Sequence, residues 1–170
     1  YSKSLKFKEK TSDKIGISGS LNNIGNIYQI QGKHDKAIDF FTQSLKIQEE
    51  IGDKNGISMS LHNIGAVYKK QGDYDIAMDY DTKSLKIKED IGDKVGVAYS
   101  LNNIGDIYLT QGDYNKAIDY GRRSLELAQE IGNSALIRDA TGLLWRVNKK
   151  LGRSKESLET VSYTHLTLPT

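Results

Sequence analysis

The chain has 170 residues, and its 24 lysines and arginines nearly balance its 22 acidic residues, which leaves a net charge of +2. This balance argues against a dedicated nucleic-acid-binding protein, which usually carries a strong basic excess. The sequence contains no cysteine, which excludes disulfides and thiolate metal sites. That absence is compatible with a cytoplasmic location, which we favour, and with the bacterial periplasm. No apolar run approaches the length of a membrane span.

One phrase recurs along the chain with a period of 40 residues. It reads SLNNIG from Ser20, SLHNIG from Ser60 and SLNNIG from Ser100. Other positions keep the same spacing, among them Ser4, Ser44, Ser84 and Ser124, then Tyr28, Tyr68 and Tyr108, and then Gly32, Gly72 and Gly112. A fixed period of this size is typical of a solenoid, in which each unit buries its apolar face only against its neighbours.

Each repeat is predicted to contain two helices. In chain order, residues 1–12 are expected to end a preceding repeat, and three full repeats follow at 16–51, 56–91 and 96–131. Their first helices are expected at 16–30, 56–70 and 96–110, and their second helices at 34–51, 74–91 and 114–131. The motifs IGDK and QGD separate the helices, because glycine suits the left-handed position after a helix end and aspartate suits the N-cap of the next helix.

A fourth, degenerate repeat is predicted over residues 135–160. It has lost the asparagines, and Trp145 stands where the other repeats have glycine. Because this repeat is incomplete, we expect Leu143, Leu144 or Trp145 to be unusually exposed, which would favour self-association through the open ends of the array.

The last ten residues, 161–170, break the period. They read VSYTHLTLPT and contain the only proline of the chain. This segment resembles a translated sequencing adapter, so we exclude it from fold reasoning as an artefactual tail. A disordered natural tail is the alternative.

The first helix of each repeat has two faces on a helical wheel. Leu21, Ile24, Ile27 and Tyr28 lie on one side, with Gly25 among them, where the missing side chain lets a neighbouring helix come close. The asparagines of the same helix fall on the opposite arc.

The motif of the repeat identifies a family. The pattern Leu-x-x-Ile-Gly-x-x-Tyr, followed by Gly-x-Tyr-x-x-Ala, resembles the tetratricopeptide repeat. The second repeat fills it with Leu61, Ile64, Gly65, Tyr68, Gly72, Tyr74 and Ala77. The long period and the paired asparagines are similar to those of Leu-Gly-Asn scaffolds, kinesin light chains and bacterial sensor proteins. The period alone would also allow HEAT or armadillo repeats, but their residue pattern is absent.

The resemblance implies a fold and a binding surface. It implies an all-α, right-handed superhelical solenoid of antiparallel helix pairs over residues 1–160, whose first helices line the concave surface. The polar arc would then face a groove. An asparagine amide both donates and accepts hydrogen bonds, so one amide per repeat could hold the backbone of an extended peptide. The candidate peptide-binding residues are Asn22, Asn23, Asn26, Met59, His62, Asn63, Lys70, Tyr99, Asn102, Asn103 and Asp106.

The alternative for these asparagines is structural, since an amide can also bond across to a neighbouring helix. Near-identical repeats can be recent duplicates, so a shared residue does not by itself indicate a shared task.

The function predicted from the sequence is a non-catalytic scaffold that binds a peptide or protein segment. No catalytic residues, cofactor or metal site are predicted, because the three histidines do not cluster and no phosphate-binding loop is present. Neither direct nucleic-acid binding nor membrane contact is expected. The alternative function is the sensory region of a bacterial signalling protein, such as a histidine kinase, a nucleotide cyclase or a DNA-binding regulator, with its effector domain outside this sequence.

Overall fold

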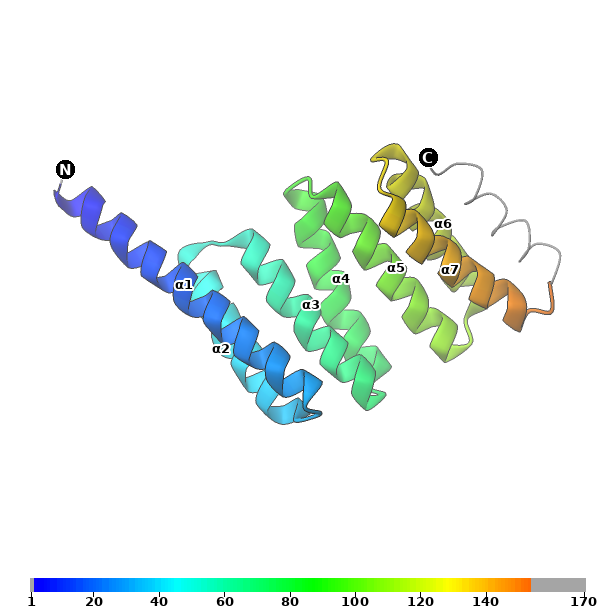
Figure 1. Cartoon of the computed structure of the whole chain (residues 1–170), viewed down its shortest axis with the longest axis horizontal. Helices are drawn as coiled ribbons and strands as arrows, with labels where there is room; N and C mark the ends of the chain where they lie inside the picture. The colour runs from blue at the N-terminus through cyan, green and yellow to red at the C-terminus, as the bar shows by residue number, and fades with distance from the viewer. Residues whose placement is uncertain (1, 154–170) are drawn as a thin grey trace. The chain divides into compact units, whose positions relative to one another are not determined.

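A computed structural model describes the backbone of residues 2–153 and the side chains of residues 13–153. These residues form seven α-helices joined by short turns, α1 (Ser2–Ile30), α2 (His34–Ile51), α3 (Lys54–Gln71), α4 (Tyr74–Asp90), α5 (Lys94–Gln111), α6 (Tyr114–Glu130) and α7 (Ser134–Lys150) (Figure 1). The predicted all-α repeat array is confirmed, whereas its superhelical handedness stays a prediction. The tail at 161–170 and the last part of the degenerate repeat lie outside the described residues.

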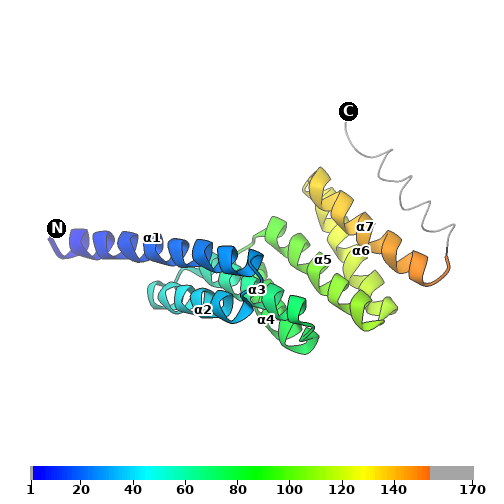
Figure 2. The same ribbon diagram turned by 60° about the horizontal axis from the view of Figure 1, so that its bottom comes forward.

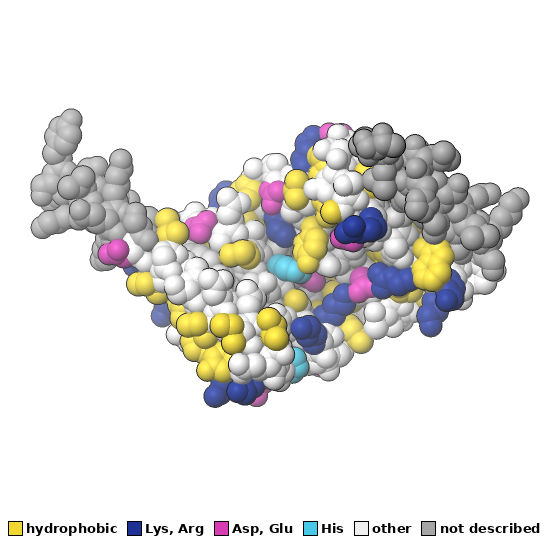
Figure 3. All heavy atoms as spheres, in the orientation of Figure 1, with side chains coloured by type: hydrophobic (Ala, Val, Ile, Leu, Met, Phe, Trp, Pro, Cys, Tyr) yellow, Lys and Arg dark blue, Asp and Glu magenta, His cyan; other side chains and the backbone are white. Residues whose placement is uncertain are grey.

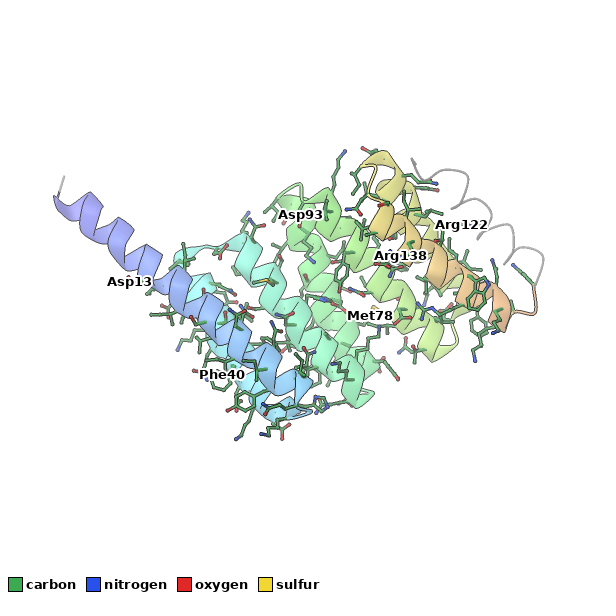
Figure 4. All side chains as sticks on the ribbon, in the orientation of Figure 1. Asp13, Phe40, Met78, Asp93, Arg122 and Arg138 are labelled. Carbon is green, nitrogen blue, oxygen red and sulfur yellow. The ribbon has the colours of Figure 1, made fainter. Side chains whose placement is uncertain are left out.

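The turns contain the predicted glycines and aspartates. Gly52, Gly72 and Gly112 follow helix ends with φ of 70°, 90° and 82°, a conformation that costs glycine little. The carboxylate of Asp93 accepts a hydrogen bond from the backbone N–H of Gly96 at 2.9 Å and caps α5 at the position labelled in Figure 4. The helices α3 and α5 begin two residues before the predicted starts, directly after their N-cap residues Asp53 and Asp93.

One predicted helix boundary is wrong. The sequence analysis placed the end of one helix before residue 12 and the start of the next at Gly16, but α1 runs without a break from Ser2 to Ile30. The later turns place a left-handed glycine at the equivalent positions Gly52, Gly92 and Gly132. The chain has Ser12 there, so this turn lacks the residue that a left-handed conformation favours.

The chain divides into two compact units, residues 1–87 (unit 1) and residues 88–170 (unit 2), and each is described here by itself. In unit 1, α2 packs against both α1 and α3, as Figures 1 and 2 show. A buried cluster of Ala37 and Phe41 from α2 with Ile64 and Val67 from α3 forms its core.

The helix packing in unit 1 explains the glycine on the apolar face of α1. A Cβ atom added at Gly25 would lie 2.6 Å from the ring of Phe41, which is closer than carbon atoms can approach. The absence of a side chain therefore lets the aromatic ring pack directly on the backbone of α1, as the sequence analysis expected.

In unit 2, α6 packs against α5 and α7, and Ala117 shares a buried cluster with Leu143 and Val147. Leu143 and Leu144 are buried, so the expectation that they are exposed is wrong. The side chain of Leu143 contacts the backbone at Gly105, and that of Leu144 contacts the backbone at Gly121. Trp145 is half-buried.

The repeated serine and tyrosine positions also have structural roles. The hydroxyl of Ser44 in α2 donates to the backbone carbonyl of Ser18 in α1 at 2.8 Å. The hydroxyl of Ser124 in α6 donates in the same way to the carbonyl of Ala98 in α5 at 2.7 Å. The repeated tyrosines pack on rings of the following helix. The pairs Tyr28–Phe40 and Tyr68–Tyr80 are stacked, and the pair Tyr108–Tyr120 is tilted by 30°.

Candidate functional site

The candidate residues divide between the two units. Those of unit 1 lie on α1 and α3, namely Asn22, Asn23, Asn26, Met59, His62, Asn63 and Lys70. Those of unit 2 lie on α5, namely Tyr99, Asn102, Asn103 and Asp106. Their surroundings differ enough to separate structural residues from candidate ligand-binding residues.

Asn22 is part of the interior of unit 1. Its side chain is 2% exposed, and its amide Nδ2 donates to the hydroxyl oxygens of Ser44 at 2.7 Å and Ser60 at 3.1 Å. The hydroxyl of Ser60 donates to the side-chain oxygen Oε1 of the buried Gln48 at 2.7 Å. The expectation that Asn22 points into a groove is therefore wrong. Its amide links α1, α2 and α3, which is the structural alternative that the sequence left open.

The other candidate residues of unit 1 are less buried. Asn23, Met59 and Lys70 are exposed, and Asn26 and Asn63 are half-buried. The amide nitrogen of Asn63 lies 3.4 Å from Oδ1 of Asn22, a long and therefore weak hydrogen bond. These side chains can contact a ligand without the loss of a short internal bond.

His62 occupies the position of Asn22 in the next repeat, and its partner is different. Its Nδ1 atom lies 2.8 Å from the carboxylate of Asp81 in α4. The side chain of Asp81 is only 2% exposed, whereas that of His62 is 17% exposed. Asp81 stands at the position that Phe41 fills one repeat earlier, so the imidazole provides the buried carboxylate with a hydrogen-bonding partner.

Unit 2 presents two polar atoms that lack partners. Among the described residues, three buried side-chain atoms make no hydrogen bond, Nδ1 of His34, Oδ1 of Asn102 and Nδ2 of Asn103. Such atoms are rare in folded proteins and call for an explanation.

The degenerate fourth repeat explains the unpaired oxygen of Asn102. In unit 1 the equivalent oxygen, Oδ1 of Asn22, accepts from Asn63 and lies 3.2 Å from the hydroxyl of Ser60. In the fourth repeat the positions of Ser60 and Asn63 are filled by Ala140 and Leu143. Neither side chain can donate a hydrogen bond.

Asp106 has an intramolecular partner that the sequence analysis missed. Its carboxylate accepts from the guanidinium of Arg146 in α7 at 2.5 Å. The two residues are 40 positions apart and thus occupy the same position of successive repeats. This spacing is the signal that could have identified the pair.

Two kinds of feature are absent from the part of the chain that the structure describes. Residues 13–153 contain no group of three histidine or acidic side chains placed to bind a metal ion. None of the described helices combines the length and the apolar character that a membrane crossing requires.

A comparison with protein families gives one match. The family model described as tetratricopeptide repeat matches residues 16–90 and 89–130. Among curated proteins, none matches this sequence significantly.

Solved structures share the fold at low sequence identity. BtubC (BKLC) from P. vanneervenii superposes with a TM-score of 0.78 at 21% identity over 88% of this chain and 62% of that one. Aspartyl phosphate phosphatase F from Bacillus subtilis gives 0.85 at 18% identity over 91% of this chain and 40% of that one. A protein described as a kinesin light chain from Podospora anserina gives 0.71 at 16% identity over 85% of this chain and 72% of that one. The chain thus spans less than two thirds of the first two proteins, and identities this low show the fold alone.

Proposed function

Since the chain belongs to the tetratricopeptide repeat family, whose members generally bind peptides or proteins and are generally non-catalytic, we propose that it is a non-catalytic module that binds an extended peptide segment. Within a unit, the proposed ligand contacts the first helices of the repeats and is held mainly by asparagine amides. In this proposal Asn22 has no direct role, because its amide is already bonded inside unit 1.

The observation that carries the proposal is the pair of unpaired atoms on α5. Asn102 contributes an acceptor and Asn103 a donor, and the two residues are adjacent. An extended peptide presents a backbone N–H and a backbone C=O at every residue other than proline. Both side chains are half-buried, and the terminal torsion of asparagine has a broad range. A rotation of each amide would therefore bring these atoms to a ligand.

The side chains that neighbour the asparagines on the first helices differ from repeat to repeat, and such variation suits the selection of specific ligand side chains. Tyr99 on α5 and Met59 on α3 are both exposed, and they occupy the same position of successive repeats. A constant asparagine would hold the peptide backbone while the variable neighbours select its side chains.

The test is a triple substitution at the most constant position, N23A/N63A/N103A. Each lost hydrogen bond is worth about 0.5–1.5 kcal/mol net, so binding should weaken by about that amount for each of the three asparagines that contacts the peptide. The probe is a peptide selected from a display library on the full chain, and affinity is measured by titration calorimetry. The matched control is N115A, because Asn115 is an exposed asparagine on α6.

Thermal unfolding of the same proteins separates binding from folding. Alanine is the better helix former, so the triple variant should unfold at or near the temperature of the parent chain. A folded triple variant that binds the peptide at full strength would contradict the proposal.

A further inference from the structure

The first helix exposes an apolar face that the later first helices bury. Ile24 and Ile27 on α1 are 37% and 53% exposed. Their equivalents one repeat later, Ile64 and Val67 on α3, are 1% and 0% exposed. Figure 3 shows hydrophobic side chains along the visible face of α1. An exposed apolar stripe of this kind on a helix marks a surface for docking.

The chain itself shows what covers such a face. In unit 1, α2 covers Ile64 and Val67 with Ala37 and Phe41. In unit 2, α6 covers Val147, at the same position of the repeat, with Ala117. The occupant in both cases is an amphipathic helix that places an alanine against the apolar stripe.

The glycine and the serine that contact the covering helix on α3 have identical equivalents on α1. A Cβ atom added at Gly56 of α3 would lie 2.7 Å from the side chain of Gln48 in the covering helix. Gly16, its equivalent on α1, has open space in that direction. The hydroxyl of Ser60 bonds to Gln48, whereas the hydroxyl of Ser20, its equivalent, bonds only within α1 to the carbonyl of Gly16.

A shallow hollow marks the same surface. It has a volume of about 640 Å³, and the described residues that line it all belong to α1, namely Asp13, Gly16, Ile17, Ser20, Leu21 and Ile24. Glycine, serine and aliphatic side chains thus alternate on α1 as they do on the part of α3 that α2 covers.

We propose that this face of α1 is a docking site for an amphipathic helix of the α2 class. Such a helix carries an alanine, an aromatic residue four positions later and a glutamine seven positions after that, as Ala37, Phe41 and Gln48 do in α2. The glutamine meets Ser20 above Gly16, and the alanine and the aromatic ring cover Ile24 and Ile27. This site is separate from the asparagine positions of the proposed function.

The probe for the experiment is a fluorescent peptide with the sequence of residues 34–51. A lactam bridge between Lys46 and Glu50, which are both exposed in α2, prefolds the peptide, since isolated helices of this length are marginal in water. Fluorescence anisotropy measures its binding to the full chain. We expect saturable binding that I24E/I27E weakens at least tenfold, because each isoleucine would lose its apolar burial.

Two controls separate this site from other surfaces. Ile76 on α4 is 44% exposed, so I76E places one glutamate at a comparable apolar position outside the face and should leave binding unchanged. N103A should also leave it unchanged, which keeps this test independent of the proposed function. Circular dichroism checks that each variant is folded, and I24A/I27A replaces the glutamate variant if that one unfolds.

Two results would overturn the proposal. One is the absence of saturable binding, or equal binding by I24E/I27E and the parent chain. The other is a dimer in sedimentation equilibrium that I24E/I27E dissociates while the peptide does not compete for it, which would assign the face to a second copy of the chain.

Discussion

Asn22 in unit 1 and Asn102 in unit 2 occupy the same position of the repeat but have different surroundings. The amide of Asn22 bonds to two serine hydroxyls in the interior, whereas Oδ1 of Asn102 has no partner among the described residues. The difference lies in the following repeat, which supplies Ser60 and Asn63 to the first asparagine but Ala140 and Leu143 to the second. A residue repeated in sequence therefore need not have a repeated role, because its neighbours decide whether its hydrogen bonds are satisfied inside the fold.

The largest effect is expected at His62, which occupies the position of Asn22 and Asn102 in the repeat between them. H62A would leave the carboxylate of Asp81 buried without its imidazole partner, and we expect a loss of about 3 kcal/mol in the free energy of unfolding. Urea denaturation measures it. H62N, which copies the asparagine of the other repeats, keeps a donor and should recover part of the loss. A loss below about 1 kcal/mol for H62A would show that the pair contributes little.

The next effect compares the two asparagines directly. N22A removes an amide that satisfies buried hydroxyls, and we expect it to cost about 1–3 kcal/mol. N102A removes an amide whose oxygen has no partner and adds a better helix former, so its unfolding free energy should change by less than about 0.5 kcal/mol. Equal losses for the two variants in the same denaturant series would mean that the two positions do not differ as described.

A smaller change should make unit 2 more like unit 1. A140S places at position 140 the hydroxyl that Ser60 and Ser100 carry in the preceding repeats. A new hydrogen bond to Oδ1 of Asn102 should stabilise the chain by about 0.5–1.5 kcal/mol. The paired variant A140S/N102A should lose this gain, and a gain that persists in it would have another cause.

The smallest effect concerns the N-terminal cap of α6, Asp113. The hydrogen bond and ion pair with Lys116 lower the pKa of Asp113 below its usual value, whereas the equivalent position in the other unit is Ile76. A carboxylate with a lowered pKa contributes stability above its unfolded-state pKa and loses it as the pH falls through the folded-state pKa. K116I should therefore raise the pKa of Asp113 and move this loss to higher pH. Side-chain carboxyl NMR titration measures the shift, and an unchanged titration of Asp113 would show that Lys116 does not set it.

The fold was largely predictable from the sequence because its signals are local. Glycine in the turns and aspartate at the caps predicted the helix ends to within two residues after residue 30, and Gly25 predicted a close approach that the ring of Phe41 makes. The failure at residue 12 has the same physical basis, since the turn glycine is missing there.

The candidate site was less predictable, because burial depends on which side chains arrive from other helices. A helical wheel places Asn22 off the apolar side of α1, but the partners of Asn22 come from α2 and α3. The wheel likewise could not show that the partner of Asp106 is Arg146. These contacts join residues 22 to 40 positions apart, and only the repeat register relates them.

The central claim is that Asn22 of unit 1 holds the fold, whereas Asn103 of unit 2, one position further along the repeat, contacts the ligand of the proposed function. The most direct measurement follows the side-chain amide protons of Asn22 and Asn103 by NMR, during titration of the full chain with the peptide selected from the display library. We predict that the Nδ2 protons of Asn103 shift and become protected from exchange as the peptide binds, whereas those of Asn22 are protected from the start and do not change. Protection gained at Asn22, with none at Asn103, would contradict the account.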